Sequence, residues 1–342
     1  MILKKWLINA RYRALMQSMM PAVLAVALAW GNTGFNALNA VLAVFGVACA
    51  HLAMNLADDY FDYKVDMRGD RDRIVRQGFR AMTVKYSYLV DGSETLKSTG
   101  IAIAVLTGVA VLCGGVIVLN LWPTHAIWGP DGLWWIGAIV IACAFMGAFY
   151  SAPPLKLAYR GLGEPVIGII FGPLLMMGVY YASCGAMNWD VVIVSIPVGM
   201  LVLNILFVHS IMDYDGDAAS NKMTLARLIG NRKANFVALA IFTFLPFVIV
   251  SVLAAVGVLP LAYLAVNVAL PRAVWLYKSV VTYRSDEQTP RPPVWMGKIV
   301  KWDQFCERKV EWFMARWLGA RNLLSGFCLM VLLCSIFLKL FI

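Results

Sequence analysis

Long apolar stretches separated by short polar segments make up most of this 342-residue chain. About 20 apolar residues are enough for a helix to cross the hydrocarbon core of a bilayer. Prolines lie inside or at the edge of several stretches, and helices in a membrane tolerate them. The pattern predicts nine membrane spans, at residues 14–31, 35–57, 98–121, 132–150, 163–184, 189–211, 234–256, 258–281 and 321–341.

The composition agrees with a membrane protein. Hydrophobic residues make up 61% of the chain and charged residues 14%, and the mean hydropathy is +0.74. A water-soluble domain has about 25% charged residues, which excludes an ordinary cytosolic enzyme. The seven cysteines show no CxxC spacing and are interpreted as apolar core residues. We expect an all-α polytopic membrane bundle of about nine helices, in which residues 1–342 form a single domain.

The positive charges predict the orientation of the spans. With the N-terminus inside, every Lys and Arg except Lys339 falls in the N-terminal segment, an inner loop or the inner end of a span. Lys and Arg are enriched on the cytoplasmic side of membrane proteins. The chain is therefore predicted to lie in the inner (cytoplasmic) membrane with its N-terminus in the cytoplasm. The net charge of +10 then needs no nucleic-acid partner.

The segment 284–320 differs from the other inner loops. Three prolines near its start favour an extended backbone, and the part that follows mixes aromatic residues with Lys and Arg. This mixture is typical of a basic amphipathic helix that lies on a membrane surface. The aromatic residues are Trp302, Phe305, Trp312, Phe313 and Trp317.

Two clusters of aspartates are predicted at the inner ends of the second and sixth spans. The first cluster contains Asp58, Asp59, Asp62 and Asp66, and the second contains Asp213, Asp215 and Asp217. Within each cluster a spacing of four residues brings carboxylates to one helix face, where like charges repel.

Oxygen ligands without accompanying His or Cys suit Mg²⁺, which is commonly bound by a few carboxylates together with substrate phosphates. Two such helix ends that face each other would form a metal–diphosphate site. The alternative is a pair of solvated acidic helix ends neutralised by nearby arginines.

Several polar residues near the clusters are candidates for substrate binding. Cations can bind phosphate oxygens that a metal leaves free. His209 lies one helical turn before Asp213, and is a candidate to orient or deprotonate an acceptor. The other candidates are Asn55, Arg68, Tyr150, Lys156, Arg160 and Lys222, and for most of the cations a purely topological role is the alternative.

The aspartate motifs resemble those of the UbiA superfamily of intramembrane prenyltransferases. The superfamily's first motif, N-D-x-x-D-x-x-x-D, corresponds to Asp58-Asp59-x-x-Asp62-x-x-x-Asp66, with Asp in the first position. Its second motif, D-x-x-x-D, corresponds to Asp213 and Asp217. The resemblance extends over nearly the whole chain, because these enzymes also have nine helices with both motifs on the cytoplasmic side.

Within the superfamily, the chain is most similar to the branch that prenylates 1,4-dihydroxy-2-naphthoate in menaquinone synthesis. NLADDYFD, YRGLGE followed by FGP, and NKMTLARLIG carry this similarity. The branch has N-N-x-R-D at the second motif, where this chain has His209-Ser210-Ile211-Met212-Asp213. YSAPPLKL is equally similar to the chlorophyll-synthase branch, and the chain beyond Thr282 is longer than expected.

The resemblance implies an Mg²⁺-dependent enzyme that transfers a polyprenyl chain from its diphosphate to an aromatic acceptor. Asp58, Asp62, Asp66, Asp213 and Asp217 are then the metal ligands. Catalytic roles fall to Asp62, Asp66, Asp213, Asp217, Tyr150 and His209, and substrate binding to Asn55, Asp58, Asp59, Arg68, Lys156, Arg160 and Lys222.

Two alternatives remain at this point. The same chemistry could act on 4-hydroxybenzoate, homogentisate or a chlorin. The chain could also be a cation-coupled transporter, although transporters have their ion sites near the membrane midplane.

Overall fold

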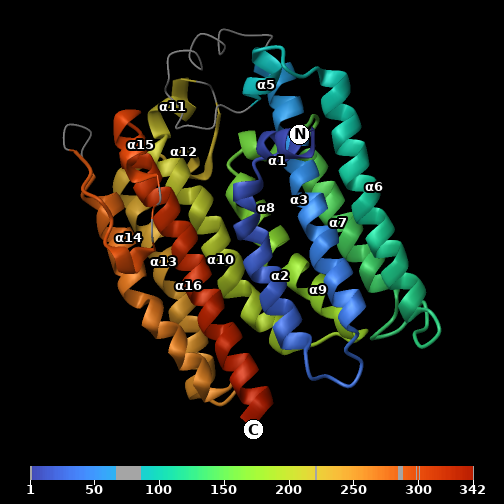
Figure 1. Cartoon of the computed structure of the whole chain (residues 1–342). Helices are drawn as coiled ribbons and strands as arrows, with labels where there is room; N and C mark the ends of the chain where they lie inside the picture. Colours follow the sequence, from blue (N-terminus) through green and yellow to red (C-terminus); the bar gives the residue numbers. More distant parts are fainter. Residues whose placement is uncertain are drawn as a thin grey trace.

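A computed structural model describes residues 2–66, 86–219, 222–283, 288–297, 299 and 301–341 (Figure 1). Asp66 lies in the described backbone, but its side chain does not, and Arg68 lies outside the described residues. The described residues form helices and connecting loops, which confirms the all-α fold class.

Eight helical segments in the described residues are long and apolar enough to cross a membrane. Two of them are composite: η1 with α2, and α8 with the π-helical turn η3 and α9. The segments are η1 (Tyr12–Leu15) with α2 (Met16–Ala29), α3 (Ala37–Asp66), α6 (Leu96–Leu121), α7 (Trp134–Ser151), α8 (Gly163–Ile169) with η3 (Ile170–Leu174) and α9 (Leu175–Cys184), α10 (Trp189–Met212), α13 (Arg232–Ala255) and α16 (Glu311–Phe341).

The predicted span at 258–281 is helical, but it is not one α-helix and is not among these eight segments. It consists of the 3₁₀ helix η4 (Leu261–Ala269) followed by α14 (Leu270–Val281). Pro271 lies at the start of α14, and a proline disfavours α-helical geometry in the residue before it. The α-helix therefore begins anew at this point.

Short helices connect the long ones. The stretch 298–317, predicted to be one surface helix, is divided between α15 and the start of α16. Lys309, between the two helices, has a φ of 55°, which a continuous α-helix cannot accommodate. The short elements are α1 (Ile2–Asn9), α5 (Ser87–Val90), η2 (Leu157–Tyr159), α11 (Tyr214–Ala219), α12 (Leu225–Ile229), η5 (Val294–Met296) and α15 (Trp302–Glu307).

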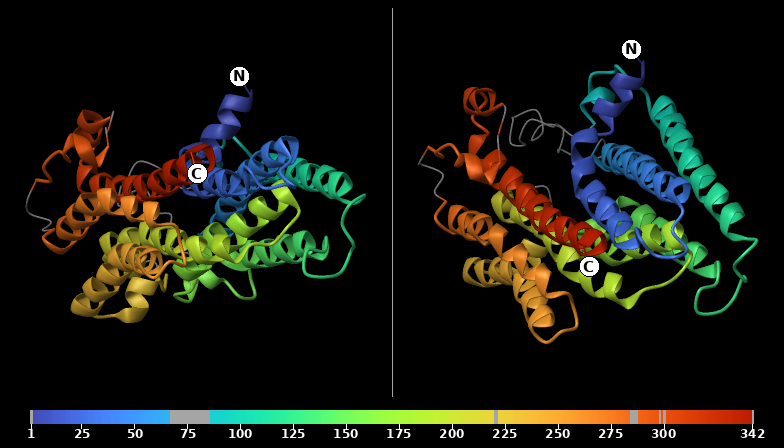
Figure 2. Two further views of the ribbon diagram at one scale, coloured as in Figure 1. Left: turned by 90° about the horizontal axis from the view of Figure 1, so that it is seen from below. Right: turned by 60° about the horizontal axis from the view of Figure 1, so that its bottom comes forward.

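The main core lies between α2, α9, α10, α13, α14 and α16. Close backbone approach joins α10 to the η3 turn, because a Cβ added to Gly172 would lie 2.5 Å from the Cα of Gly199. Small residues permit such approach between membrane helices. Figure 2 shows α16 running beside α2, so the last span closes the bundle against the first.

The two ends of the bundle differ. The N-terminus, α5, α11 and α15 lie at one end, and the C-terminus lies at the other (Figure 1). Both aspartate motifs lie at the first end, at the C-terminal ends of α3 and α10. Large apolar side chains cover the flanks between the ends, as they do in helices that face lipid. The side chains of Val41, Leu112, Leu119, Ile141 and Val268, for example, are 66% to 71% exposed.

Candidate active site

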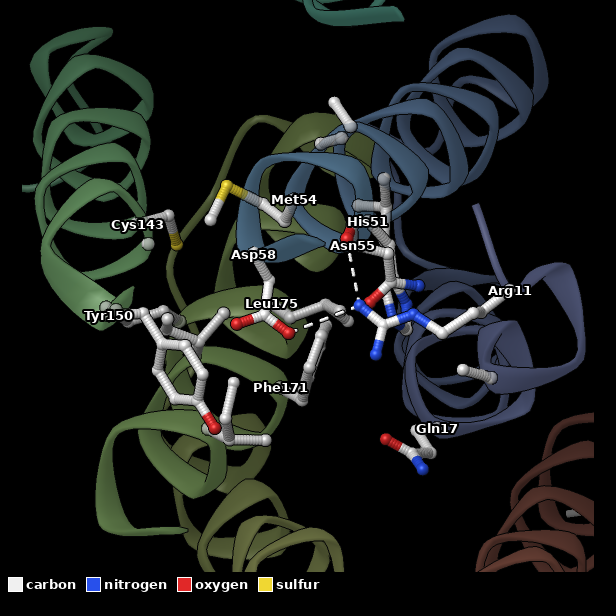
Figure 3. A pocket seen from close by; sticks show the side chains of 18 of the residues that line it. Arg11, Gln17, His51, Met54, Asn55, Asp58, Cys143, Tyr150, Phe171 and Leu175 are labelled. Atoms are coloured by element: carbon white, nitrogen blue, oxygen red, sulfur yellow. Dashed lines mark hydrogen bonds and ion pairs between the residues drawn. The ribbon is translucent and has the colours of Figure 1, made fainter. Parts of the chain in front are cut away.

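Asp58 is held from two sides at the end of α3. The hydroxyl of Ser151, the last residue of α7, donates to Oδ1 of Asp58 at 2.6 Å. Arg11 donates to Oδ2 at 3.2 Å and to the backbone carbonyl of Asn55 at 2.8 Å (Figure 3). The N-terminal segment and α7 together therefore fix the direction of this carboxylate.

Asp59 points toward α5. Its Oδ2 accepts hydrogen bonds from the Tyr86 N–H and the Tyr88 hydroxyl, both at 3.2 Å, and its Oδ1 lies 3.3 Å from Arg11. Burial and then the charge of Asp59 raise the pKa of the Tyr88 hydroxyl, so that it stays a donor. Burial alone would lower the pKa of Arg11, but Asp59 and Asp58 outweigh it and raise that pKa. Asp59 thus ties the end of α3 to the start of α5.

Asp62 lies one turn further along α3 and is 4% exposed. The Tyr159 hydroxyl, in η2, donates to Oδ1 of Asp62 at 2.7 Å. Lys156 and Arg160 flank η2. Arg160 donates to the Pro154 carbonyl at 3.3 Å, and its backbone pairs with Met223 beyond the second motif. This loop therefore bridges the two motifs.

The second motif begins where α10 ends. Asp213 caps α10, and its Oδ2 lies 4.0 Å from Nε2 of His209. The Asp217 N–H donates to the Asp213 carbonyl at 2.8 Å, which forms the first turn after the break. A Cβ added to Gly216 would lie 2.5 Å from Oδ1 of Asp213. Glycine at this position therefore leaves room for the carboxylate.

Beyond the turn, the backbone carbonyl of Asp217 accepts from the Lys222 N–H at 2.9 Å and from Arg227 at 3.2 Å. Arg227 also donates to the Lys222 carbonyl at 2.7 Å. These bonds hold Asp217 and Lys222 beside each other.

Glu164, in α8, is a buried residue that the sequence analysis missed. It is 3% exposed, and the Ser210 hydroxyl donates to its Oε1 at 2.5 Å. The Leu225 N–H also donates to Oε1, at 3.2 Å. Glu164 thus ties α8 to α10 and to the start of α12. The sequence contains a signal for Glu164, because a carboxylate at the start of an apolar span is a functional candidate.

A cavity of about 1590 Å³ opens between the two motifs and continues into the bundle. Its polar wall brings together seven predicted residues, while Asp62, Lys156 and Arg160 are not part of its wall as far as the structure is described. Figure 3 shows Asp58, Asn55 and Tyr150 projecting into the same space. The seven residues are Asn55, Asp58, Tyr150, His209, Asp213, Asp217 and Lys222.

The interior of the cavity is apolar. Its wall there includes Leu42, Ile117, Ile139, Leu175 and Val179, from α3, α6, α7 and α9. One end of the space is thus suited to a charged group and the other to a hydrocarbon chain.

The donor set fits a magnesium ion. Asp58 lines the cavity from α3, and Asp213 and Asp217 line it from the α10 end, so carboxylate oxygens approach one space from two elements. Among the described residues, no three His, Cys, Asp or Glu side chains are close enough to hold a metal by themselves. Mg²⁺ is commonly bound by one or two carboxylates plus substrate phosphates, so this arrangement fits an ion that binds with its substrate.

Known proteins resemble this chain in sequence. A 1,4-dihydroxy-2-naphthoate octaprenyltransferase of Bacillus subtilis is 25% identical over 229 residues, which cover 66% of this chain and 65% of that protein. A protein of the same name from Mycobacterium tuberculosis is 27% identical over 67% of this chain and 71% of its own length. A 2-carboxy-1,4-naphthoquinone phytyltransferase of Synechocystis is 29% identical over 45% of this chain and 50% of its own length. The matches thus span about half to two thirds of these relatives.

The fold is also known. A UbiA homolog from Archaeoglobus fulgidus bound to DMAPP and Mg²⁺ superimposes with a TM-score of 0.62, covering 95% of this chain and 99% of that one at 13% identity. Residues 18–299 match the UbiA prenyltransferase family. Together with the apolar helices, this match identifies an integral multi-pass membrane protein. The chain belongs to the UbiA prenyltransferase family.

Proposed function

We propose that the protein transfers a polyprenyl chain from its diphosphate to 1,4-dihydroxy-2-naphthoate, in menaquinone biosynthesis. The observation that carries the proposal is that carboxylates of both aspartate motifs line one cavity, whose interior is apolar. The relatives named for transfer to this acceptor support its identity. A transporter is disfavoured by family membership and by the position of both motifs at one end of the bundle.

Asp58, Asp62, Asp66, Asp213 and Asp217 would hold Mg²⁺ against the diphosphate. When bound, the metal supplies positive charge that offsets the charge of the leaving diphosphate. Ser151 and Arg11 orient Asp58, and Tyr159 orients Asp62, so the carboxylates are directed before substrate arrives. Lys222 binds diphosphate oxygens from within the cavity wall, Lys156 and Arg160 do so from the two sides of η2, and Arg68 is proposed to bind them from its position in the sequence two residues after Asp66.

The reaction exchanges a C–O bond for a C–C bond. The bond between the allylic carbon and the diphosphate oxygen breaks, and its electron pair leaves with the diphosphate. A carbon of the electron-rich acceptor ring donates an electron pair to the allylic carbon, and His209 accepts the proton that the attacked carbon loses. Tyr150 faces the developing cation with its ring, and the apolar wall excludes water that would otherwise capture it.

The membrane orientation is part of the proposal. The end of the bundle that carries both motifs also carries the N-terminus, and this end faces the cytoplasm if the excess of Lys and Arg follows the positive-inside rule. A reporter fused after Ile342 is expected to read as non-cytoplasmic. A cytoplasmic reading would contradict the proposed orientation.

The acceptor is tested by direct comparison. Purified enzyme with one prenyl diphosphate and Mg²⁺ is given 1,4-dihydroxy-2-naphthoate, 4-hydroxybenzoate, homogentisate and a chlorophyllide in parallel. Prenylation of the first acceptor is expected. Prenylation of any other acceptor without the first would overturn the menaquinone assignment and leave the proposed chemistry standing.

A further inference from the structure

Two arginines on one side of the cavity have no role in the mechanism above. Arg321, on α16, and Arg13, in η1, both line the cavity, and α16 packs along α2, which follows directly after η1. Arg321 is half-buried, and its guanidinium lies 5.7 Å from the centre of the Trp317 ring. As far as the chain is described, no carboxylate forms an ion pair with either arginine. Burial of a charge without a partner is unfavourable, so Arg321 calls for an anion, and the exposed Arg13 adds a second positive charge to the same cavity.

Arg321 lies at the end of a row of aromatic side chains along α16, which we call the stripe. Phe313, Trp317 and Arg321 are spaced by four residues, which brings them to one helix face, and all three line the cavity. The stripe begins next to the second motif, because the Phe313 ring packs edge-on against His209 with centroids 4.9 Å apart. At 1.5 Å per residue, the stripe extends about 12 Å, enough for a bicyclic ring that carries a carboxylate.

The start of α16 is held firmly against its neighbours. Arg316, on another face of the helix, is 5% exposed and donates to the Ser279 carbonyl at 2.7 Å. Its guanidinium also lies over the Tyr283 ring at 4.5 Å. These contacts fix α16 to α14, so the stripe is a rigid wall, as a binding site requires.

We propose that this stripe is the acceptor subsite. The carboxylate of an aromatic acceptor binds between Arg321 and Arg13, and its ring lies along Trp317 and Phe313 with the far edge toward His209. The inference rests on the proposed function and assigns it a specificity residue. Arg321 lies beyond residue 299, where the family match ends, so this residue belongs to the C-terminal part of the chain that the family match does not cover.

The test compares two ligands that differ by one carboxylate, 1-hydroxy-2-naphthoate and 1-naphthol. Their binding to the full chain in nanodiscs, with prenyl diphosphate and Mg²⁺ present, is measured by equilibrium dialysis against empty nanodiscs. The variant is Arg321→Gln, and the control is Arg308→Gln, an exposed arginine between α15 and α16. The ratio of the two dissociation constants is independent of the folded fraction, because both ligands are measured on one preparation.

In the unmodified chain, 1-hydroxy-2-naphthoate is expected to bind roughly tenfold more tightly than 1-naphthol. A charge-assisted hydrogen bond between the carboxylate and an arginine is strong enough to account for this difference in affinity. Arg321→Gln should abolish this preference, Arg308→Gln should retain it, and the KM for prenyl diphosphate should not change. If Arg321→Gln does not yield protein, Arg13→Gln takes its place with the same expectation.

Two results would overturn the inference. They are an unchanged preference in the variant, whether or not both ligands bind more weakly, and no preference in the unmodified chain. If the preference is instead lost when anionic phospholipid is added to the nanodiscs, the arginines bind lipid phosphate and the acceptor subsite is rejected. A chain that prenylates no naphthoate at all fails the proposed function, whereas one that does so with an unchanged preference in Arg321→Gln fails only this inference.

Discussion

The two aspartate motifs are built in different ways. Among the described residues, the partners of Asp58, Asp59 and Asp62 come from distant parts of the chain: Arg11, Tyr86, Tyr88, Ser151 and Tyr159. The contacts described for Asp213 and Asp217 are local, with His209, Gly216, Lys222 and Arg227. The described contacts thus tie the first motif to distant elements, whereas those of the second motif lie within and just after the turn that ends α10.

This difference matters for how the site is assembled. The first motif can be correctly oriented only after the N-terminal segment, α5 and α7 have packed around α3. The turn between α10 and α11 contributes directly to the position of the second motif, through the Asp217 N–H bond to the Asp213 carbonyl and the space beside Gly216. Loss of a distant partner should therefore affect folding and activity together, whereas a local change at the second motif should affect activity alone.

The largest effect is expected where either motif loses a negative charge. Asp62→Asn and Asp213→Asn should each lower prenyl transfer by on the order of 10²-fold or more, because each removes a charge that holds the metal on the leaving diphosphate. Asp190→Asn, at the opposite end of α10, is the matched control and should retain activity. Full turnover of the unmodified enzyme in saturating chelator would contradict the metal assignment for both motifs.

Gly216→Ala separates local geometry from stability. A Cβ there would meet Oδ1 of Asp213 at 2.5 Å and displace the carboxylate. Misplacement by about 1 Å can reduce a rate by roughly 10²-fold. Alanine is also a better helix former than glycine, so the Tm in detergent should stay the same or rise. A normal rate in this variant would show that the position of Asp213 is not set by this turn.

Arg11→Met tests the distant partners of the first motif. It leaves Asp58 and Asp59 without the cation that they share, and loss of one member of a buried ion pair costs about 3 kcal/mol. Both the Tm and the rate should fall. The Tm can be followed with a thiol-reactive dye, because unfolding exposes cysteines that are buried in the folded chain. These are Cys49, Cys113, Cys184 and Cys328. Arg232→Met, at an exposed position, is the control; an equal Tm for the two variants would reject the structural role of Arg11.

The same difference explains what could be predicted from the sequence. Hydropathy predicted the spans, and the spacing of four predicted which aspartates share a helix face. The break within the span at 258–281 was missed because hydropathy does not distinguish a 3₁₀ helix from an α-helix. Pro271 gave a partial signal.

The tertiary contacts could not be predicted in this way. From the sequence, Arg11 is only one of the positive charges on the inner side of the membrane, because its partners lie 44 and 47 residues away. The direction of Asp59 toward α5 likewise depends on a residue 27 positions away, Tyr86.

The central claim is that both motifs hold one metal–diphosphate complex in one cavity. Its most direct test is calorimetric binding of a non-reactive prenyl thiodiphosphate, with Mg²⁺ or with chelator, to the unmodified chain and to Asp58→Asn and Asp213→Asn. Binding is expected to require Mg²⁺ and to be lost in either variant. The double variant should bind the thiodiphosphate no more weakly than each single variant does. Tight binding in chelator, or loss in only one of the two variants, would contradict the claim.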